Sequence, residues 1–295
     1  MTDEDLNRLN RQGLIAGPGE TEEEFKRRVD YCLSLNETMA EDFSEEVPFA
    51  KQNSRLAAPI LEESFELTKK LYDVKPDWIP CFFSNYHLAP WHGGCAWIFQ
   101  KSDDTPMGAF LQLRKALFRK SVYFGFYKRK ELVAHELCHA ARMMFEEPEF
   151  EEMLAYRTSS ASFQKYLGSI ARSSIEAMVF FLAVFLIILI DIMVLVSGYE
   201  HLLEPLMWLK LIPLAMVAYA GMRLWKSGRT FRRCFKNLRK TLGASDPANA
   251  VIYRLTDEEV AKFSKMPADD ILAFAKEERN KEVRWKQIYE YFRRC

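Results

Sequence analysis

One segment of this chain is apolar enough to cross a lipid bilayer, and no other feature constrains the fold as strongly. Residues 177–190 form an unbroken run of fourteen apolar residues, and Asp191 alone separates it from five more. Twenty residues at a rise of 1.5 Å match a hydrocarbon core about 30 Å thick. Their side chains favour insertion by roughly 4.5 to 9 kcal/mol, against about 3 kcal/mol for one aspartate. We therefore predict a transmembrane helix at about 175–197 and not a buried core helix.

A second, weaker apolar segment follows at 206–225. It has a basic residue near each end, Lys210 and Arg223, and a tryptophan near each end as well. Long basic side chains can extend to the two bilayer surfaces, where tryptophan is also common. The connection of nine residues, 197–205, then predicts a helical hairpin, with an interfacial helix as the alternative for the second segment.

The charged flanks predict the orientation of this hairpin. Eight Lys and Arg side chains and no acid lie in 222–240, whereas the connection 197–205 contains no base. Because basic flanks stay on the cytoplasmic side, we expect a two-pass integral membrane protein with both termini in the cytoplasm. Asp191 inside the first span is either functional or bonded to the partner helix.

Composition narrows the choice of partners further. The 41 basic and 41 acidic side chains give a net charge of zero, which argues against a nucleic-acid partner. The acidic start of the chain has no signal-peptide pattern. Six cysteines are present without a paired spacing, and a cytoplasmic location favours free thiols.

Outside the hairpin, the patterns predict an α+β fold. Thr21 and Glu24 have the spacing of a capping box, before a helix that ends near Leu35. Short aromatic and β-branched runs predict a small sheet of three or four strands at 78–84, 95–100, 110–113 and 121–126. Helical patterns occur at 59–72, 128–145, 149–167, 227–242, 257–264 and, as one long exposed helix, 268–294, with a short strand at 251–255.

The helix predicted directly after the sheet contains the sequence HELCH. His135 and His139 are four residues apart, so both imidazoles lie on one helical face and can bind one metal ion. Glu136 is placed to take a proton from a metal-bound water. Two neutral nitrogens and one further ligand leave a fourth position for that water, which is the arrangement of hydrolytic zinc sites. The charged residues at 128–131 keep this helix out of lipid.

A third ligand is expected on the next helix, after a turn at 146–148. Glu152 begins a Glu-x-x-Ala pattern thirteen residues after His139 and is our first choice. Glu151 is the alternative beside it, and His87 and His92 are alternatives from a loop before the helix. Arg142, one turn after His139, is either a surface residue or one that orients a ligating carboxylate.

The segments HELCHAAR and FEEMLAY, placed after a sheet, resemble the zincin metallopeptidases, and among them the gluzincin type. The resemblance covers about 78–167. It implies a zincin-like catalytic domain that binds Zn²⁺ through His135, His139 and Glu152 and hydrolyses peptide bonds. This family often has an aspartate directly after the Ala of the Glu-x-x-Ala pattern, where this chain has Tyr156.

By the same resemblance, Glu136 is the general base and then the proton donor to the leaving amine. Tyr156 is the nearest candidate to stabilise the oxyanion, with simple packing as the other interpretation. In such folds an extended protein or peptide substrate adds to an exposed edge strand, for which 95–100 or 121–126 would serve.

These predictions divide the chain into four parts. They are an N-terminal helical region at 1–44, a metallopeptidase domain at 45–170, the hairpin at 174–226, and a basic helix with a cytoplasmic helical tail at 227–295. The alternative function is a non-catalytic membrane scaffold or adaptor, with a zinc-stabilised or metal-free domain, whose basic helix touches anionic headgroups. The sequence gives no indication of the oligomeric state.

Overall fold

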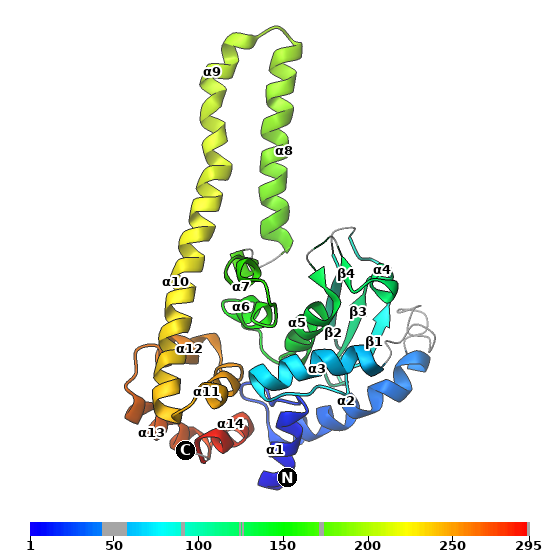
Figure 1. Ribbon diagram of the computed structural model, residues 1–295, viewed down its shortest axis with the longest axis vertical. Coiled ribbons are helices and arrows are strands. Elements are labelled where there is room, and N and C mark those ends of the chain that lie inside the picture. Colours follow the sequence, from blue (N-terminus) through cyan, green and yellow to red (C-terminus); the bar gives the residue numbers. More distant parts are fainter. Residues whose placement is uncertain (43–57, 90–91, 124, 126, 171–173, 294–295) are drawn as a thin grey trace.

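The structure is a computed structural model that describes residues 1–42, 58–89, 92–123, 125, 127–170 and 174–293. Within these residues the fold is α+β and mostly helical, with two apolar helices extending away from the rest (Figure 1). The first helices and the strands are α1 (Asp3–Arg11), α2 (Glu22–Asp42), α3 (Ala58–Tyr72), β1 (Cys81–Phe83), β2 (Gly94–Phe99), β3 (Gly108–Leu113), α4 (Ala116–Arg119), β4 (Val122–Tyr123) and β5 (Tyr127–Lys128). They are followed by α5 (Arg129–Ala141), α6 (Glu151–Tyr156), α7 (Ser162–Leu167), η2 (Gly168–Ile170), α8 (Ser174–Val196), η3 (Glu200–Leu202), α9 (Leu203–Leu206), η4 (Met207–Lys210), α10 (Leu211–Leu242), α11 (Ser245–Ile252), α12 (Asp257–Phe263), α13 (Ala268–Glu278) and α14 (Val283–Arg293).

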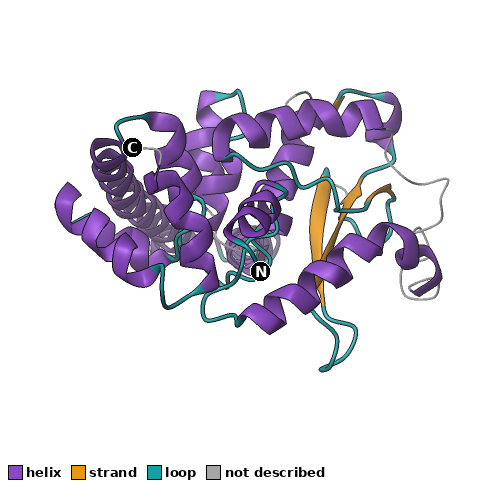
Figure 2. Ribbon diagram, turned by 90° about the horizontal axis from the view of Figure 1, so that it is seen from below, coloured by secondary structure: helices purple, strands orange, loops and turns teal. Residues whose placement is uncertain are grey.

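The small sheet has three strands in the order β1-β3-β2, so β2 is an edge strand. β1 runs parallel to β3, and β2 runs antiparallel to it with Ala96 opposite Leu111. Figure 2 shows these strands with helices on both sides. The predicted strand at 121–126 does not join this sheet. Instead, Val122 pairs with Lys128 in a separate hairpin of β4 and β5, because the chain reverses around Gly125, whose φ is +76°.

Two apolar helices form the predicted hairpin. None of the most apolar part of either helix is buried by the protein. α8 ends in a Schellman arrangement, in which Gly198 has φ +72° and the Tyr199 amide donates to the Val194 carbonyl. Asp191 forms an ion pair of 3.0 Å with Lys210, so the acid in the first apolar helix is bonded to the second, as one of the two interpretations expected.

The second apolar helix and the basic helix are one continuous element, α10. Pro213 is tolerated because it occupies the first turn, where its missing N–H has no helical partner. The lower part of α10 packs one face onto the core through Phe231, Cys234 and Leu238, with its basic residues on the other face. The protein therefore extends the predicted span directly into its folded part.

The C-terminal predictions were wrong in two places. The expected strand at 251–255 is the end of α11 and a turn, because Val251, Ile252 and Tyr253 are completely buried against other helices. The expected long exposed helix at 268–294 is two helices, α13 and α14. Their apolar side chains share one hydrophobic cluster with residues of α5 and α6.

The two ends of the chain are also packed together. The predicted helical region 1–44 includes α1, for which the sequence analysis gave no separate bounds. α1 starts with a Thr2 and Asp5 capping box. Its Asn10 side chain donates to the Gln287 carbonyl, and the Gln287 side chain accepts from the Ala16 amide at 2.9 Å. Figure 1 shows α1 and α14 next to each other at the end opposite the hairpin.

We predict that α14 contributes strongly to stability. Ile288→Ala removes a fully buried side chain and should cost about 2–5 kcal/mol of unfolding free energy. Lys276→Ala, at an exposed position of α13, is the control and should change it by less than about 0.5 kcal/mol. Thermal unfolding of the full chain in mild detergent measures both; equal midpoints would mean that α14 is not part of the core.

Candidate metal centre

The HELCH sequence lies in the second half of α5, between two hydrophobic clusters. Val133 and Leu137 face the sheet, whereas Cys138 faces the C-terminal helices. The Tyr253 hydroxyl donates to the Cys138 carbonyl at 2.7 Å, which fixes α5 to the C-terminal region. The two histidines lie on the remaining face, so the packing of α5 directs both imidazoles toward α6.

α6 is capped by a distant part of the chain. After α5 ends at Ala141, a turn containing Pro148 reverses the direction. The Asp257 carboxylate accepts from the Glu149 amide at 2.6 Å and the Phe150 amide at 3.2 Å, so it satisfies the N–H groups of the N-cap residue of α6 and of the residue before it. This cap holds α6 next to α5.

Three donor atoms from α5 and α6 converge on one point. His135 Nε2 and His139 Nε2 are 3.2 Å apart. The Glu152 oxygens lie 3.6 Å from the former and 3.5 Å from the latter. A tetrahedral ion with bonds of 2.0–2.1 Å separates its ligand atoms by about 3.3–3.4 Å. The two Glu152 distances are to different carboxylate oxygens, Oε2 for His135 and Oε1 for His139. One ligand atom from each of the three side chains lies within 4.8 Å of the other two, so they could hold one metal ion, and they are the one such group in the described part of the chain.

Both histidines have an outer hydrogen-bond partner, as metal-binding imidazoles usually do. His139 Nδ1 is 3.1 Å from Glu151 Oε1, and Arg142 Nε donates to the other Glu151 oxygen at 2.7 Å. His135 hydrogen-bonds the backbone of Ala155. Glu151, the alternative ligand, therefore contacts His139 from outside the group of His135, His139 and Glu152, and Arg142 is a buried residue that holds it.

The surroundings of the two imidazoles shift their pKa values in opposite directions. Burial, with the neighbouring His139, lowers the pKa of His135 well below its usual range. Burial also acts to lower the pKa of His139, but the hydrogen bond to Glu151 and the charge of Glu152 outweigh it and raise that pKa to about 9. Burial raises the pKa of Glu152. Burial also acts to raise the pKa of Glu151, but Arg142 and His139 together outweigh it and lower that pKa.

Glu136 points from α5 toward the sheet. Its Oε2 accepts a hydrogen bond of 2.7 Å from the backbone amide of Ala96 in β2. Burial and the charge of Glu152 raise the pKa of Glu136 to about 7. A carboxyl group with this pKa can both accept and return a proton near neutral pH.

Tyr156 lies at the other side of the histidines. Its ring centre is 4.5 Å from that of His135, at an angle of 66°. The ring also packs on Gly168, where a Cβ atom would come within 2.5 Å of it. Burial raises the pKa of Tyr156, so its phenol stays protonated and can donate a hydrogen bond.

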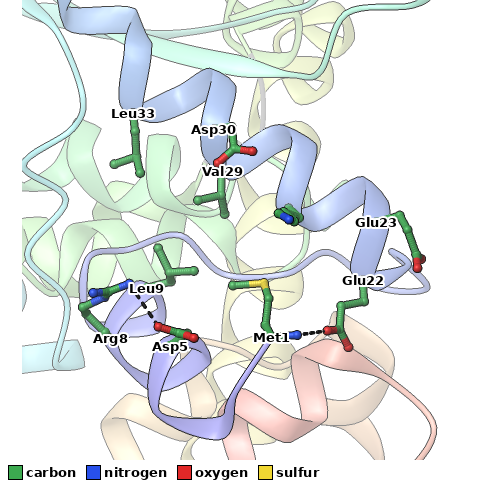
Figure 3. A pocket seen from close by; sticks show the side chains of 10 residues that line it. Met1, Asp5, Arg8, Leu9, Glu22, Glu23, Val29, Asp30 and Leu33 are labelled. Atoms are coloured by element: carbon green, nitrogen blue, oxygen red, sulfur yellow. Dashed lines mark hydrogen bonds and ion pairs between the residues drawn. The ribbon is translucent and has the colours of Figure 1, made fainter.

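Other candidate residues lie outside the metal group. The His87 ring packs edge to face on the Tyr86 ring, and the backbone of His92 is hydrogen-bonded to Ala89 and to Arg114. A cavity of about 590 Å³ between α1 and α2 has none of the metal donors in its lining (Figure 3).

Comparisons with known proteins add no relative: no protein-family model, curated protein or solved structure matches this chain. The function of this protein must therefore be inferred from the geometry of its own side chains.

The two neighbouring glutamates should respond differently to substitution. Glu152→Ala removes a ligand and should abolish stoichiometric Zn²⁺ binding, whereas Glu151→Gln should weaken binding by about 10- to 100-fold because only the orientation of His139 suffers. Competition with a chromophoric chelator measures both affinities, and Glu146→Ala, exposed on the turn, is the control. The reverse order of the two effects would identify Glu151 as the ligand.

Proposed function

We propose that this protein is an integral-membrane zinc metallopeptidase of the zincin type, similar to gluzincins. The observation that carries the proposal is the convergence of His135, His139 and Glu152 beside a buried Glu136 of raised pKa. Two imidazoles, one carboxylate and space for a fourth ligand are the donor set of catalytic zinc. When bound, zinc would supply an acidified water and polarise a substrate carbonyl.

The remaining chemistry falls to side chains of this chain. Glu136 takes the proton of the attacking water and returns it to the leaving amine. Its hydrogen bond to the Ala96 amide places the carboxylate between α5 and β2. The Tyr156 phenol donates to the oxyanion as it forms.

An extended peptide is the substrate that the edge strand favours. β2 pairs with β3 on one side, and the Ala96 N–H points to the other side, toward Glu136. The alternation of an antiparallel ladder directs the backbone groups of Gly94 and Ile98 to that same free side. A peptide added there as a strand would pass directly over Glu136.

We further propose that α8 and α10 cross the bilayer with both termini in the cytoplasm. α8 has 23 residues, or about 34 Å, which is enough to span the hydrocarbon core. Trp208 and Trp225, both exposed, lie near opposite ends of the second span, as interfacial tryptophans do. The metal group on α5 and α6 then faces the cytoplasm close to the membrane.

The scaffold alternative is less well supported. It depends on the basic residues of 222–240 touching anionic headgroups, but α10 continues straight away from the apolar region (Figure 1). Lys240 is 15 residues beyond Trp225, or about 22 Å along the helix. This exceeds the Debye length of about 8 Å at physiological salt, so the far bases would contribute little to lipid binding.

The direct test of catalysis is Glu136→Gln in the purified full chain. This variant should keep its Zn²⁺ but lose peptidase activity on an unfolded protein such as casein by about 10²- to 10⁴-fold. Glu146→Gln is the matched control and should retain full activity. Retained activity in Glu136→Gln would refute the assigned base, and metal binding without any peptidase activity would favour a zinc-stabilised domain.

A second substitution separates catalysis from packing at Tyr156. Tyr156→Phe keeps the ring between His135 and Gly168 but removes the hydroxyl. If the phenol stabilises the oxyanion, kcat should fall by about 10²-fold while zinc affinity and thermal stability stay unchanged. An unchanged kcat would leave Tyr156 a packing role only.

A further inference from the structure

A short basic segment next to the hairpin contains no acid. The described residues 115–123 and 127–130, which we call the basic tip, include six Lys and Arg side chains and neither Asp nor Glu. They form α4, β4 and β5. In Figure 1, α4 and β4 lie at the end of the folded part that faces the hairpin, at the height of α7 and of the lower end of α8.

Two of these six bases have hydrogen-bond or ion-pair partners within the protein. Arg129 donates to the Leu117 and Phe118 carbonyls and so holds α4 against the start of α5. Lys128 pairs with Glu131 at 3.2 Å. The other four bases are exposed and, within the described residues, form no ion pair: Lys115, Arg119, Lys120 and Lys130. Three of them, Lys115, Arg119 and Lys120, lie within six residues of one another on and around α4. Like charges this close repel one another, so an anionic surface would stabilise them.

The basic tip also exposes apolar side chains. Phe118 is 62% exposed and directly precedes Arg119 and Lys120. On the other side of the hairpin base, α7 exposes Phe163 and Tyr166 just before the chain enters α8. Aromatic residues beside Lys and Arg are typical of surfaces that lie in a bilayer interface.

A groove of about 260 Å³ at the basic tip could hold a headgroup. Its lining combines the three consecutive bases at the junction of β5 and α5 with one acid, and consists of Ile60, Glu63, Ser121, Val122, Lys128, Arg129 and Lys130. With Glu131, which pairs with Lys128, counted as well, the bases exceed the acids by one charge, so the groove favours a phosphate or carboxylate over a cation.

We propose that the basic tip binds anionic headgroups of the same bilayer that holds the hairpin. Because α8 rises along the long axis of the molecule, the near surface of a bilayer around α8 and α10 lies at the level of the basic tip (Figure 1). Clusters of about four to eight Lys and Arg on the cytoplasmic side of a span are typical of binding to anionic lipid. The inference rests on the proposed membrane insertion and is independent of the metal chemistry.

The test uses the full chain in vesicles. The photocrosslinking residue p-benzoylphenylalanine replaces Phe118, and in a matched control it replaces Leu33, which is 46% exposed on α2. Each protein is reconstituted in phosphatidylcholine with or without phosphatidylserine, and lipid crosslinking is measured. Crosslinking at position 118 should rise about fivefold or more with phosphatidylserine and fall again in high salt, with position 33 at background in both.

Charge reversal completes the design. Combining Lys115→Glu, Arg119→Glu and Lys120→Glu should return crosslinking at position 118 to the level of phosphatidylcholine alone. Lipid crosslinking no higher than at position 33, equal yields in both lipids, or crosslinking to protein instead of lipid would each overturn the inference. Extraction of the chain by alkaline carbonate would instead refute the membrane insertion itself. The candidate metal centre is tested separately by Zn²⁺ content, which neither the crosslinking result nor the extraction result would change.

Discussion

The buried ion pair between Arg142 and Glu151 is the interaction on which the rest of the site depends. The Arg142 side chain is 1% exposed and donates to Glu151 at 2.7 Å, and Glu151 in turn contacts His139. A buried guanidinium is costly unless its donors are satisfied. Here Arg142 Nη1 donates to the carbonyls of Tyr253 and Leu255, in the C-terminal region.

Through these contacts the C-terminal region supports the candidate metal centre. Tyr253 supports α5 through Cys138, its carbonyl accepts from Arg142, and Asp257 caps α6. Each contact joins residues more than 100 positions apart in the chain. Charged and polar groups at the junction of α5 and α6 are buried, and a buried polar group without a hydrogen-bond partner is costly in free energy. Residues in and next to α11 and α12 supply these partners. Two short helices thereby gain the rigidity that a three-donor site needs.

Sequence alone could predict what depends on local spacing. His135 and His139 follow from one helical turn, and Glu152 from a short reversal after it. The outer role of Glu151 could not be predicted, because it depends on how the turn at 142–150 aligns α6.

Likewise, the β-branched run at 251–255 indicates a strand locally, but burial on all sides outweighs that preference. The charged composition of 268–294 indicates an exposed helix, but Arg284 and Trp285 within it are buried and both donate hydrogen bonds to the Glu259 carboxylate. The sequence signal for α1 is a capping box of Thr2 and Asp5, and the helix that follows it is short.

The metal group and the base of the hairpin are joined by direct packing. The Tyr156 ring lies between His135 and Gly168, and a side chain at Gly168 would collide with it. Two residues later, the Ile170 carbonyl accepts from Arg223 of α10 at 3.0 Å. Arg223 also holds α8 through two hydrogen bonds to Glu176, of 2.6 and 2.7 Å. If a flexible linker joined the site to the hairpin, the distance between the site and a bilayer would vary. Here the side-chain contacts fix that distance. A hairpin inserted in a membrane would therefore hold His135 at a constant distance from the lipid surface.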